Sequence, residues 1–292
     1  MAIPNSAKFK YEIVQDYKVK NGKAGRFSAG KPTWVVVHSS GNPNAGLDSE
    51  IAYMTRNQNN AFTQAWAGHN KIVEIANTDY PAWGAGRTAN KYAVQIEVTE
   101  DKRLSKAQKL QAIDREAFWV AVQCAYYGIP LSKVYSHADI SRMYPQDTDH
   151  TDPIAFFKSV GVSWSQFKSQ VKKYHDVLKA GGDTTKITSL DGQNTTVTAS
   201  KPQGNVNIGI VKKYAEKGVF YPNETIIVRD APTTKANIVT RYYKGENLTY
   251  HTVHIGNGYV WLEYLRNNGK SGFIPIREYN NGKFDKLWGT IK

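Results

Sequence analysis

Residues 34–38, WVVVH, decide the fold of the first half of the chain. Trp34 is followed by three consecutive valines, and a continuous run of β-branched residues is typical of a strand buried on both faces. His38 follows the run directly. It therefore lies at the carboxyl end of the predicted strand, where side chains emerge at the rim of an α/β domain.

The segments after this strand alternate between strand and helix patterns. Residues 61–76 are predicted to form a hairpin, and residues 92–98, YAVQIEV, another strand. Residues 105–128 have the periodicity and end signals of a long amphipathic helix, and two more helices are predicted after Pro153 and from Ser163. Strands that alternate with helices indicate an α/β domain.

The second half of the chain has a different pattern. Residues 179–205 are rich in Gly, Thr, Ser and Asn and have few large apolar groups, so they are predicted to form a flexible linker between residues 1–178 and 206–292. After the linker, short β-type runs are separated by turn signals such as PN, KGEN and GNG. This spacing predicts a small all-β barrel.

Composition limits the classes of partner. The net charge is +13, which favours an anionic partner such as nucleic acid, a membrane surface or a cell-wall polymer. The basic residues are dispersed and form no Lys/Arg stripe, so nucleic acid is not expected. No apolar run approaches the ~20 residues of a membrane span. The single cysteine, Cys124, allows no internal disulfide, and the first residues lack a signal-peptide pattern, which predicts synthesis in a cytoplasm.

Residues 136–153, SHADISRMYPQDTDHTDP, place two histidines among four aspartates. Polar residues around a proline are typical of a turn, so a metal site needs a further ligand from elsewhere. His38 can supply it. A catalytic zinc takes three protein ligands and keeps one position open. His38 and His137 supply two, and the candidates for the third are Asp152, His150 and Asp149.

Glu97 is the only carboxylate inside the predicted strand 92–98. Burying an ionisable group among apolar residues is costly, which makes it a candidate general base beside a metal. Trp83 and Asn90, which precede it, are candidates for lining a substrate groove. Spacing alone leaves open that His38 and His137 are two unrelated polar residues at the rim.

Four motifs occur together in order: WVVVHSSGNP, AWGAGRTANKYAVQIEV, YSHADIS and DHTDP. Over about residues 30–175 the chain thus resembles the zinc-dependent type-2 N-acetylmuramoyl-L-alanine amidases, whose fold is shared with peptidoglycan recognition proteins. The resemblance implies an α/β zinc amidase domain with a central mixed sheet flanked by helices. It implies Zn²⁺ as cofactor, with His38, His137 and Asp152 as ligands. Whether Asp152 or His150 is the third ligand stays open.

The same resemblance implies the reaction, which is hydrolysis of the amide between N-acetylmuramic acid and the L-alanine of the stem peptide. Zinc lowers the pKa of water, Glu97 accepts the proton, and His150 stabilises the oxyanion. Two alternatives are a zinc endopeptidase that cuts within the stem peptide and a non-catalytic peptidoglycan-binding protein.

Residues 206–292 resemble the bacterial SH3-like domains of wall hydrolases through GVFYPNETIIVRDAP, YVWLEYL and the final WGTI. The whole layout resembles bacteriophage endolysins. It implies an enzyme made in the host cytoplasm without a signal peptide, which reaches the wall of a Gram-positive host after release through a holin. The expected partners are peptidoglycan and anionic wall polymers, with no nucleic acid and no membrane.

Overall fold

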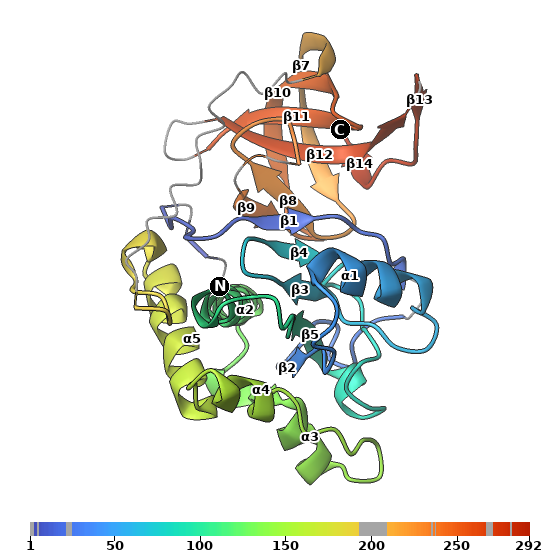
Figure 1. The fold of residues 1–292 in the computed structure, drawn as a ribbon. Coiled ribbons are helices and arrows are strands. Elements are labelled where there is room, and N and C mark those ends of the chain that lie inside the picture. The colour runs from blue at the N-terminus through green and yellow to red at the C-terminus, as the bar shows by residue number, and fades with distance from the viewer. Residues whose placement is uncertain are drawn as a thin grey trace. The chain divides into compact units, whose positions relative to one another are not determined.

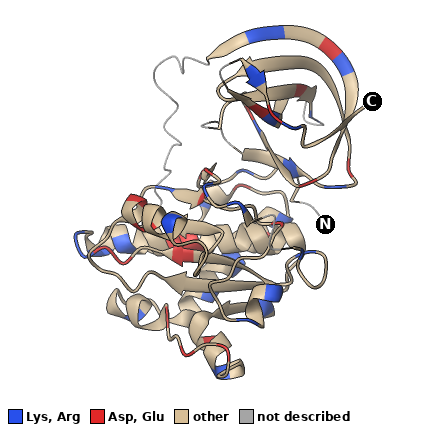
Figure 2. Ribbon diagram, turned by 90° about the vertical axis from the view of Figure 1, so that its right-hand side faces the viewer, with Lys and Arg blue, Asp and Glu red and all other residues tan. Residues whose placement is uncertain are grey.

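The computed structural model describes residues 3–292 except 5, 22–24, 193–208, 235, 237, 267–270 and 281. The chain splits into two compact units, Met1–Val197 and Thr198–Lys292 (Figure 1). Among the helices of the described residues, none is both long and apolar enough to cross a membrane. Lys and Arg are scattered over the ribbons of both units, as the dispersed charge of the sequence predicts (Figure 2).

The N-terminal unit is built on a six-stranded sheet with the order β1-β4-β3-β5-β2-β6. Its strands are β1 (Ile13–Gln15), β2 (Trp34–Ser39), β3 (Ala65–Ala67), β4 (Ile72–Glu74), β5 (Ala93–Val98) and β6 (Val134–Ser136). Neighbours are parallel except in the hairpin of β3 and β4, so the predicted mixed sheet is confirmed. The three valines of β2 are fully buried, as their continuous β-branched run predicts.

Helices surround this sheet. They are α1 (Leu47–Arg56), α2 (Lys106–Tyr127), α3 (His137–Met143), α4 (Ile154–Ser159) and α5 (Trp164–Lys179), with short 3-10 turns η2 (Ala89–Lys91), η3 (Leu131–Lys133) and η4 (Thr184–Lys186). The three predicted helices correspond to α2, α4 and α5. Ser105 starts α2 with a capping box, and Gly128 ends it in the left-handed region at φ 70°. Helices α1 and α3 were not predicted.

The N-terminal unit extends beyond residue 178, through residues that the sequence analysis assigned to a linker. Thr184 is fully buried, and its Oγ1 accepts a hydrogen bond from the Lys10 backbone N–H at 2.8 Å. The Leu190 N–H donates to Asp114 Oδ1 at 3.1 Å. This part of the segment belongs to the N-terminal unit because it pairs with polar groups of Lys10 and of Asp114 in α2. Residues 193–205 of the predicted linker lie outside the described residues.

The C-terminal unit is all β, as predicted. Its strands are β7 (Ile210–Pro222), β8 (Ile226–Arg229), β9 (Ile238–Tyr242), β10 (Leu248–Gly256), β11 (Tyr259–Leu265), β12 (Ser271–Asn280), β13 (Lys283–Phe284) and β14 (Gly289–Ile291). The order is β14-β7-β10-β11-β12-β8-β9, and β13 pairs with β12. All pairs are antiparallel. Phe220, Val228, Leu262 and Ile274 are fully buried in its core.

Candidate active site

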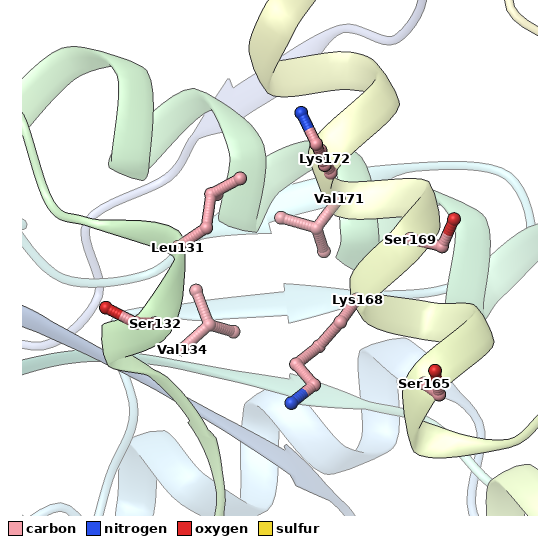
Figure 3. Close-up of a pocket in the computed structure, with 8 residues that line it drawn as sticks. All are labelled: Leu131, Ser132, Val134, Ser165, Lys168, Ser169, Val171 and Lys172. Atoms are coloured by element: carbon pink, nitrogen blue, oxygen red, sulfur yellow. The ribbon is translucent and has the colours of Figure 1, made fainter.

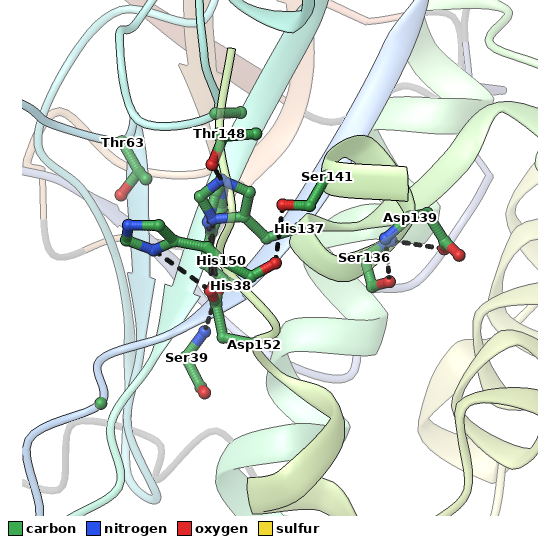
Figure 4. Close-up of polar contacts among 12 residues, drawn as sticks. His38, Ser39, Thr63, Ser136, His137, Asp139, Ser141, Thr148, His150 and Asp152 are labelled. Carbon is green, nitrogen blue, oxygen red and sulfur yellow. Dashed lines mark hydrogen bonds and ion pairs between the residues drawn. The ribbon is translucent and has the colours of Figure 1, made fainter. Parts of the chain in front are cut away.

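Three side chains from separate elements converge at the rim of the N-terminal sheet (Figure 4). His38 lies near the end of β2, His137 opens α3, and Asp152 lies in the loop before α4. The Nδ1 atoms of the two histidines are 3.0 Å apart. Asp152 Oδ2 is 3.3 Å from His38 Nδ1, and its Oδ1 is 3.2 Å from His137 Nδ1. One ligand atom from each residue lies within 4.8 Å of the others, so a single metal ion could contact all three.

Strand pairing and a helix cap bring these residues together. Strands β2 and β6 are parallel, with Val37 beside Ser136, so His38 and His137 each follow a paired residue. Ser136 then ends the strand and caps α3 through the Asp139 N–H. The Ser39 N–H donates to Asp152 Oδ2 at 3.2 Å and holds the carboxylate beside the histidines.

The electrostatics favour the protonation states that metal ligands need. Burial acts to raise the pKa of Asp152, but hydrogen bonds from His137 and His38 outweigh it and hold that pKa far below its usual range. Burial and the neighbouring His38 lower the pKa of His137. Asp152 is therefore ionised and His137 tends to be neutral. Two nitrogen donors and a carboxylate are a donor set that zinc accepts.

His150 lies beside this cluster but outside the group that could hold a metal. Its ring stacks on His137 with centroids 4.6 Å apart, and its Nδ1 is 3.6 Å from Asp152 Oδ1. The side chain is 64% exposed. Asp149, the other candidate for the third ligand, is exposed and also outside the group. Geometry thus favours Asp152 in the third position and leaves His150 at the mouth of the site.

Glu97 lies beside His38 in the parallel pairing of β5 with β2, so the two side chains share a face of the sheet. Its Oε2 is buried and has no hydrogen-bond partner among the described residues. Burial, followed by the charges of Asp152, Glu50 and Glu100, raises the pKa of Glu97 well above its usual range. A carboxyl with a raised pKa holds a proton more readily, which suits a group that exchanges protons during catalysis.

Comparison with known families agrees with this geometry. Residues 28–155 match the family model of N-acetylmuramoyl-L-alanine amidases, and residues 212–276 match that of bacterial SH3 domains. The chain carries an amidase domain and a bacterial SH3 domain. The matched amidase region includes His38, Glu97, His137 and Asp152.

Several curated proteins are similar to the chain in sequence. The bifunctional autolysin of Staphylococcus epidermidis is 28% identical over 290 residues, which are 93% of this chain and 21% of that protein. Protein Ami of Listeria monocytogenes is 24% identical over 259 residues, 82% of this chain and 27% of that protein. The chain thus spans about a quarter of the length of these curated relatives.

Among solved structures, the Staphylococcus aureus hydrolase AmiA in complex with its ligand matches with a TM-score of 0.53 and 26% identity. The match covers 59% of this chain and 86% of AmiA. It confirms the α/β fold of the amidase domain, and together with the family match it supports N-acetylmuramoyl-L-alanine amidase activity.

Trp83 and Asn90 hold the loop that leads into β5 of the amidase domain. Trp83 Nε1 donates to the Gln58 carbonyl at 2.8 Å. Asn90 Oδ1 accepts from the Ala85 N–H at 2.9 Å and from Gln95 Nε2 at 3.0 Å. These bonds give both residues a role in the shape of the loop, and their contact with substrate stays a prediction.

The amidase domain contains a further hollow away from these residues. It lies between α5 and the segment that leads into β6, and its lining includes Leu131, Val134, Lys168 and Lys172 (Figure 3). None of the predicted site residues lines it.

A residue that sequence reasoning missed is Thr148, whose Oγ1 is 2.8 Å from His137 Nε2. No periodicity or motif spacing distinguishes this threonine from its polar neighbours.

Proposed function

We propose that the chain is a zinc-dependent amidase that hydrolyses the bond between N-acetylmuramic acid and the L-alanine of the peptidoglycan stem peptide. The observation that carries the proposal is the convergence of His38, His137 and Asp152. Glu97 lies on the same face of the sheet as His38, and its Oε2 has no hydrogen-bond partner among the described residues. The amidase family match supports the choice of bond.

His38 Nδ1, His137 Nδ1 and Asp152 would hold the zinc ion. When bound there, zinc supplies Lewis-acid chemistry that lowers the pKa of a water molecule towards ~7. The fit rests on the donor set and its spacing. Two Nδ1 atoms and a carboxylate face one another within 3.3 Å, and each can offer a lone pair to a cation placed between them.

Glu97 acts as the general base. Its raised pKa brings it closer to the working pH, where a carboxyl can both accept and return a proton. It takes a proton from the attacking water and returns it to the leaving amine of L-alanine. His150, exposed at the mouth, is free to donate a hydrogen bond to the carbonyl oxygen as negative charge develops there.

The bacterial SH3 domain is proposed to attach the enzyme to peptidoglycan, which raises the effective concentration of the amidase domain at the wall. The net charge of +13 adds attraction to anionic wall polymers. The resemblance of the layout to phage endolysins supports a role in lysis of a Gram-positive host, with synthesis in the host cytoplasm and release through a holin.

Mass spectrometry of peptidoglycan fragments tests the reaction. The zinc-loaded chain is expected to release free L-alanine amino termini and leave glycan strands intact, while the zinc-loaded Glu97→Gln variant serves as the control. New termini within the stem peptide would instead establish the endopeptidase. If the zinc-loaded chain binds peptidoglycan and produces no new termini, it is a non-catalytic binding protein.

A further inference from the structure

The two ring nitrogens of His137 face different partners. Nδ1 points to His38 and Asp152, while Nε2 lies 2.8 Å from the hydroxyl of Thr148 (Figure 4). His137 is only 2% exposed, so Nε2 has almost no contact with solvent. Thr148 therefore decides whether this nitrogen has a hydrogen-bond partner.

A neutral imidazole carries one proton, and the nitrogen that binds a metal must be the bare one. If His137 binds zinc through Nδ1, its proton is on Nε2 and is donated to Thr148 Oγ1. We propose that Thr148 is a positioning residue that holds His137 in the tautomer and orientation in which Nδ1 faces the metal. This inference rests on the zinc site of the proposed function.

Thr148 is itself held in place by the residue before it. Asp147 Oδ2 accepts the Thr88 backbone N–H at 2.7 Å, and Oδ1 lies 3.5 Å from Arg87 Nη2. The side chain of Asp147 is 2% exposed. The hydrogen bond from Thr88 is the main reason that the pKa of Asp147 is lowered, so the carboxylate stays charged and keeps this bond.

The backbone of the facing loop is shaped for this contact. Gly86 has a φ of +85°, and a Cβ added there would lie 3.1 Å from the Cβ of Asp147. A glycine meets both the backbone angle and the close approach. The loop that carries Thr148 is therefore fixed against the loop before β5 by contacts that involve none of the proposed ligands.

The two histidines differ in how they are held. His38 lies within β2, where it pairs with Glu97 of β5 and directly follows Val37, which pairs with β6. Its Nε2 is buried without a hydrogen-bond partner in the described part of the chain. His137 opens a helix of seven residues at the end of an edge strand. It has less support from the backbone, and Thr148 supplies the missing constraint.

The test uses the full chain with Thr148→Val, which keeps the shape and removes the hydroxyl, and Thr148→Ser, which restores the hydroxyl. Zinc affinity is measured by competition with a chromogenic chelator.

The control is Thr184→Val, because Thr184 is also buried in the N-terminal unit and its hydroxyl donates to the Lys8 carbonyl at 2.6 Å, away from the site. We expect Thr148→Val to weaken zinc binding by about 10–100-fold and Thr148→Ser to restore most of it. Thr184→Val should lower the melting temperature and leave zinc affinity unchanged.

Nitrogen-15 NMR of the histidine rings gives a second readout that a merely structural role would not move. In the zinc-free chain, Thr148→Val should shift His137 towards the tautomer with its proton on Nδ1, where Asp152 can accept it. Wild-type zinc affinity together with an unchanged tautomer in Thr148→Val would overturn the proposal. A wild-type chain that binds no zinc would refute the metal site of the proposed function, and the role of Thr148 would fall with it.

Discussion

Each unit buries a histidine beside a carboxylate, yet the two groups differ in how their polar atoms are matched. In the C-terminal unit, His254 Nε2 is 2.8 Å from Glu263 Oε2, and Glu263 Oε1 accepts the hydroxyl of Ser271 at 2.7 Å. Both carboxylate oxygens have partners, so the group is complete without a ligand. A buried histidine next to an acid is therefore not by itself a sign of a metal site.

The group in the N-terminal unit is incomplete at Glu97. His38 and His137 direct the same type of ring nitrogen at each other and at Asp152. Glu97, paired with His38 across the sheet, has a buried oxygen without a partner among the residues described. Two facing ring nitrogens beside a carboxylate, together with this oxygen, distinguish the site from the complete group of the C-terminal unit.

The largest effect is expected from removing a proposed ligand. His38→Ala and His137→Ala should each lose both zinc and hydrolysis, because three protein ligands are near the minimum that holds a catalytic zinc. His254→Ala, which removes the buried histidine of the other unit, is the matched control and should keep zinc. Metal content after gel filtration and release of amino termini from peptidoglycan measure the two properties. Stoichiometric zinc with near-normal hydrolysis in His38→Ala would exclude that residue from the site.

Glu97→Gln should keep zinc and lose turnover by about 10²–10⁴-fold, because the amide preserves the shape and cannot accept the proton. Zinc content and initial rates on soluble muropeptide separate the two effects. Glu263→Gln is the control in the C-terminal unit and should leave the rate on this small substrate unchanged. A rate for Glu97→Gln within a few-fold of wild type would show that the base is another group.

Asp114 of α2 is a third buried carboxylate, and it resembles the complete group. It accepts the hydroxyls of Tyr11 and Tyr174 at 2.6 Å each, Gln170 Nε2 at 2.8 Å and the Leu190 N–H at 3.1 Å. Asp114→Ala should lower the free energy of unfolding of the N-terminal unit by about 3 kcal/mol, because several buried donors lose their acceptor. Zinc affinity of the folded variant should stay at the wild-type value. Urea unfolding and chelator competition measure the two, and an unchanged unfolding midpoint would contradict this role.

The regular elements could be predicted because local pattern and burial agree. The valines of β2 and the caps of α2 are strong local signals, and both elements form as expected. Helix α3 was not predicted because its residues are mostly polar. Its stability comes from the Ser136 cap and from Ile140, which packs with Val36. Residues 184–190 have the composition of a linker, and their hydrogen-bond partners, which include Lys10 and Asp114, are distant in the sequence.

The site was predictable in its residue types and not in its geometry. His38 and Glu97 are neighbours because β5 pairs with β2, although β3 and β4 lie between them in the sequence. The spacing of the two residues in the sequence does not reveal that they are neighbours. The resemblance of the ordered motifs to an amidase family placed both residues in one site. The contact of Thr148 with His137 depends on the path of a loop, which leaves no periodic signal.

The smallest effect concerns the stability of the two units against pH, where Glu97 and Glu263 should behave in opposite ways. The pKa of Glu97 is raised in the folded state, mainly by burial. At a pH between the unfolded and the folded pKa, Glu97 therefore keeps its proton in the folded state and has lost it in the unfolded state. Stability of the zinc-free N-terminal unit should therefore fall as pH rises through the window between the two pKa values. Glu97→Gln removes this loss, so its stability relative to wild type should increase as pH rises.

For Glu263, burial acts to raise the pKa, but hydrogen bonds from Ser271 and His254 outweigh it and lower the pKa below its usual range. The stability that Glu263 contributes is therefore present above the unfolded pKa and is lost as pH falls through the folded one. Glu263→Gln should destabilise the C-terminal unit at pH 7 and have little effect once the pH falls below the folded-state pKa of Glu263. Thermal unfolding of both variants from pH ~3 to ~8, with chelator present, gives the two slopes. If the effects of the two substitutions on stability change with pH in the same direction, the two carboxyls are not distinguished by their partners. The contrast drawn between Glu97 and Glu263 would then be wrong.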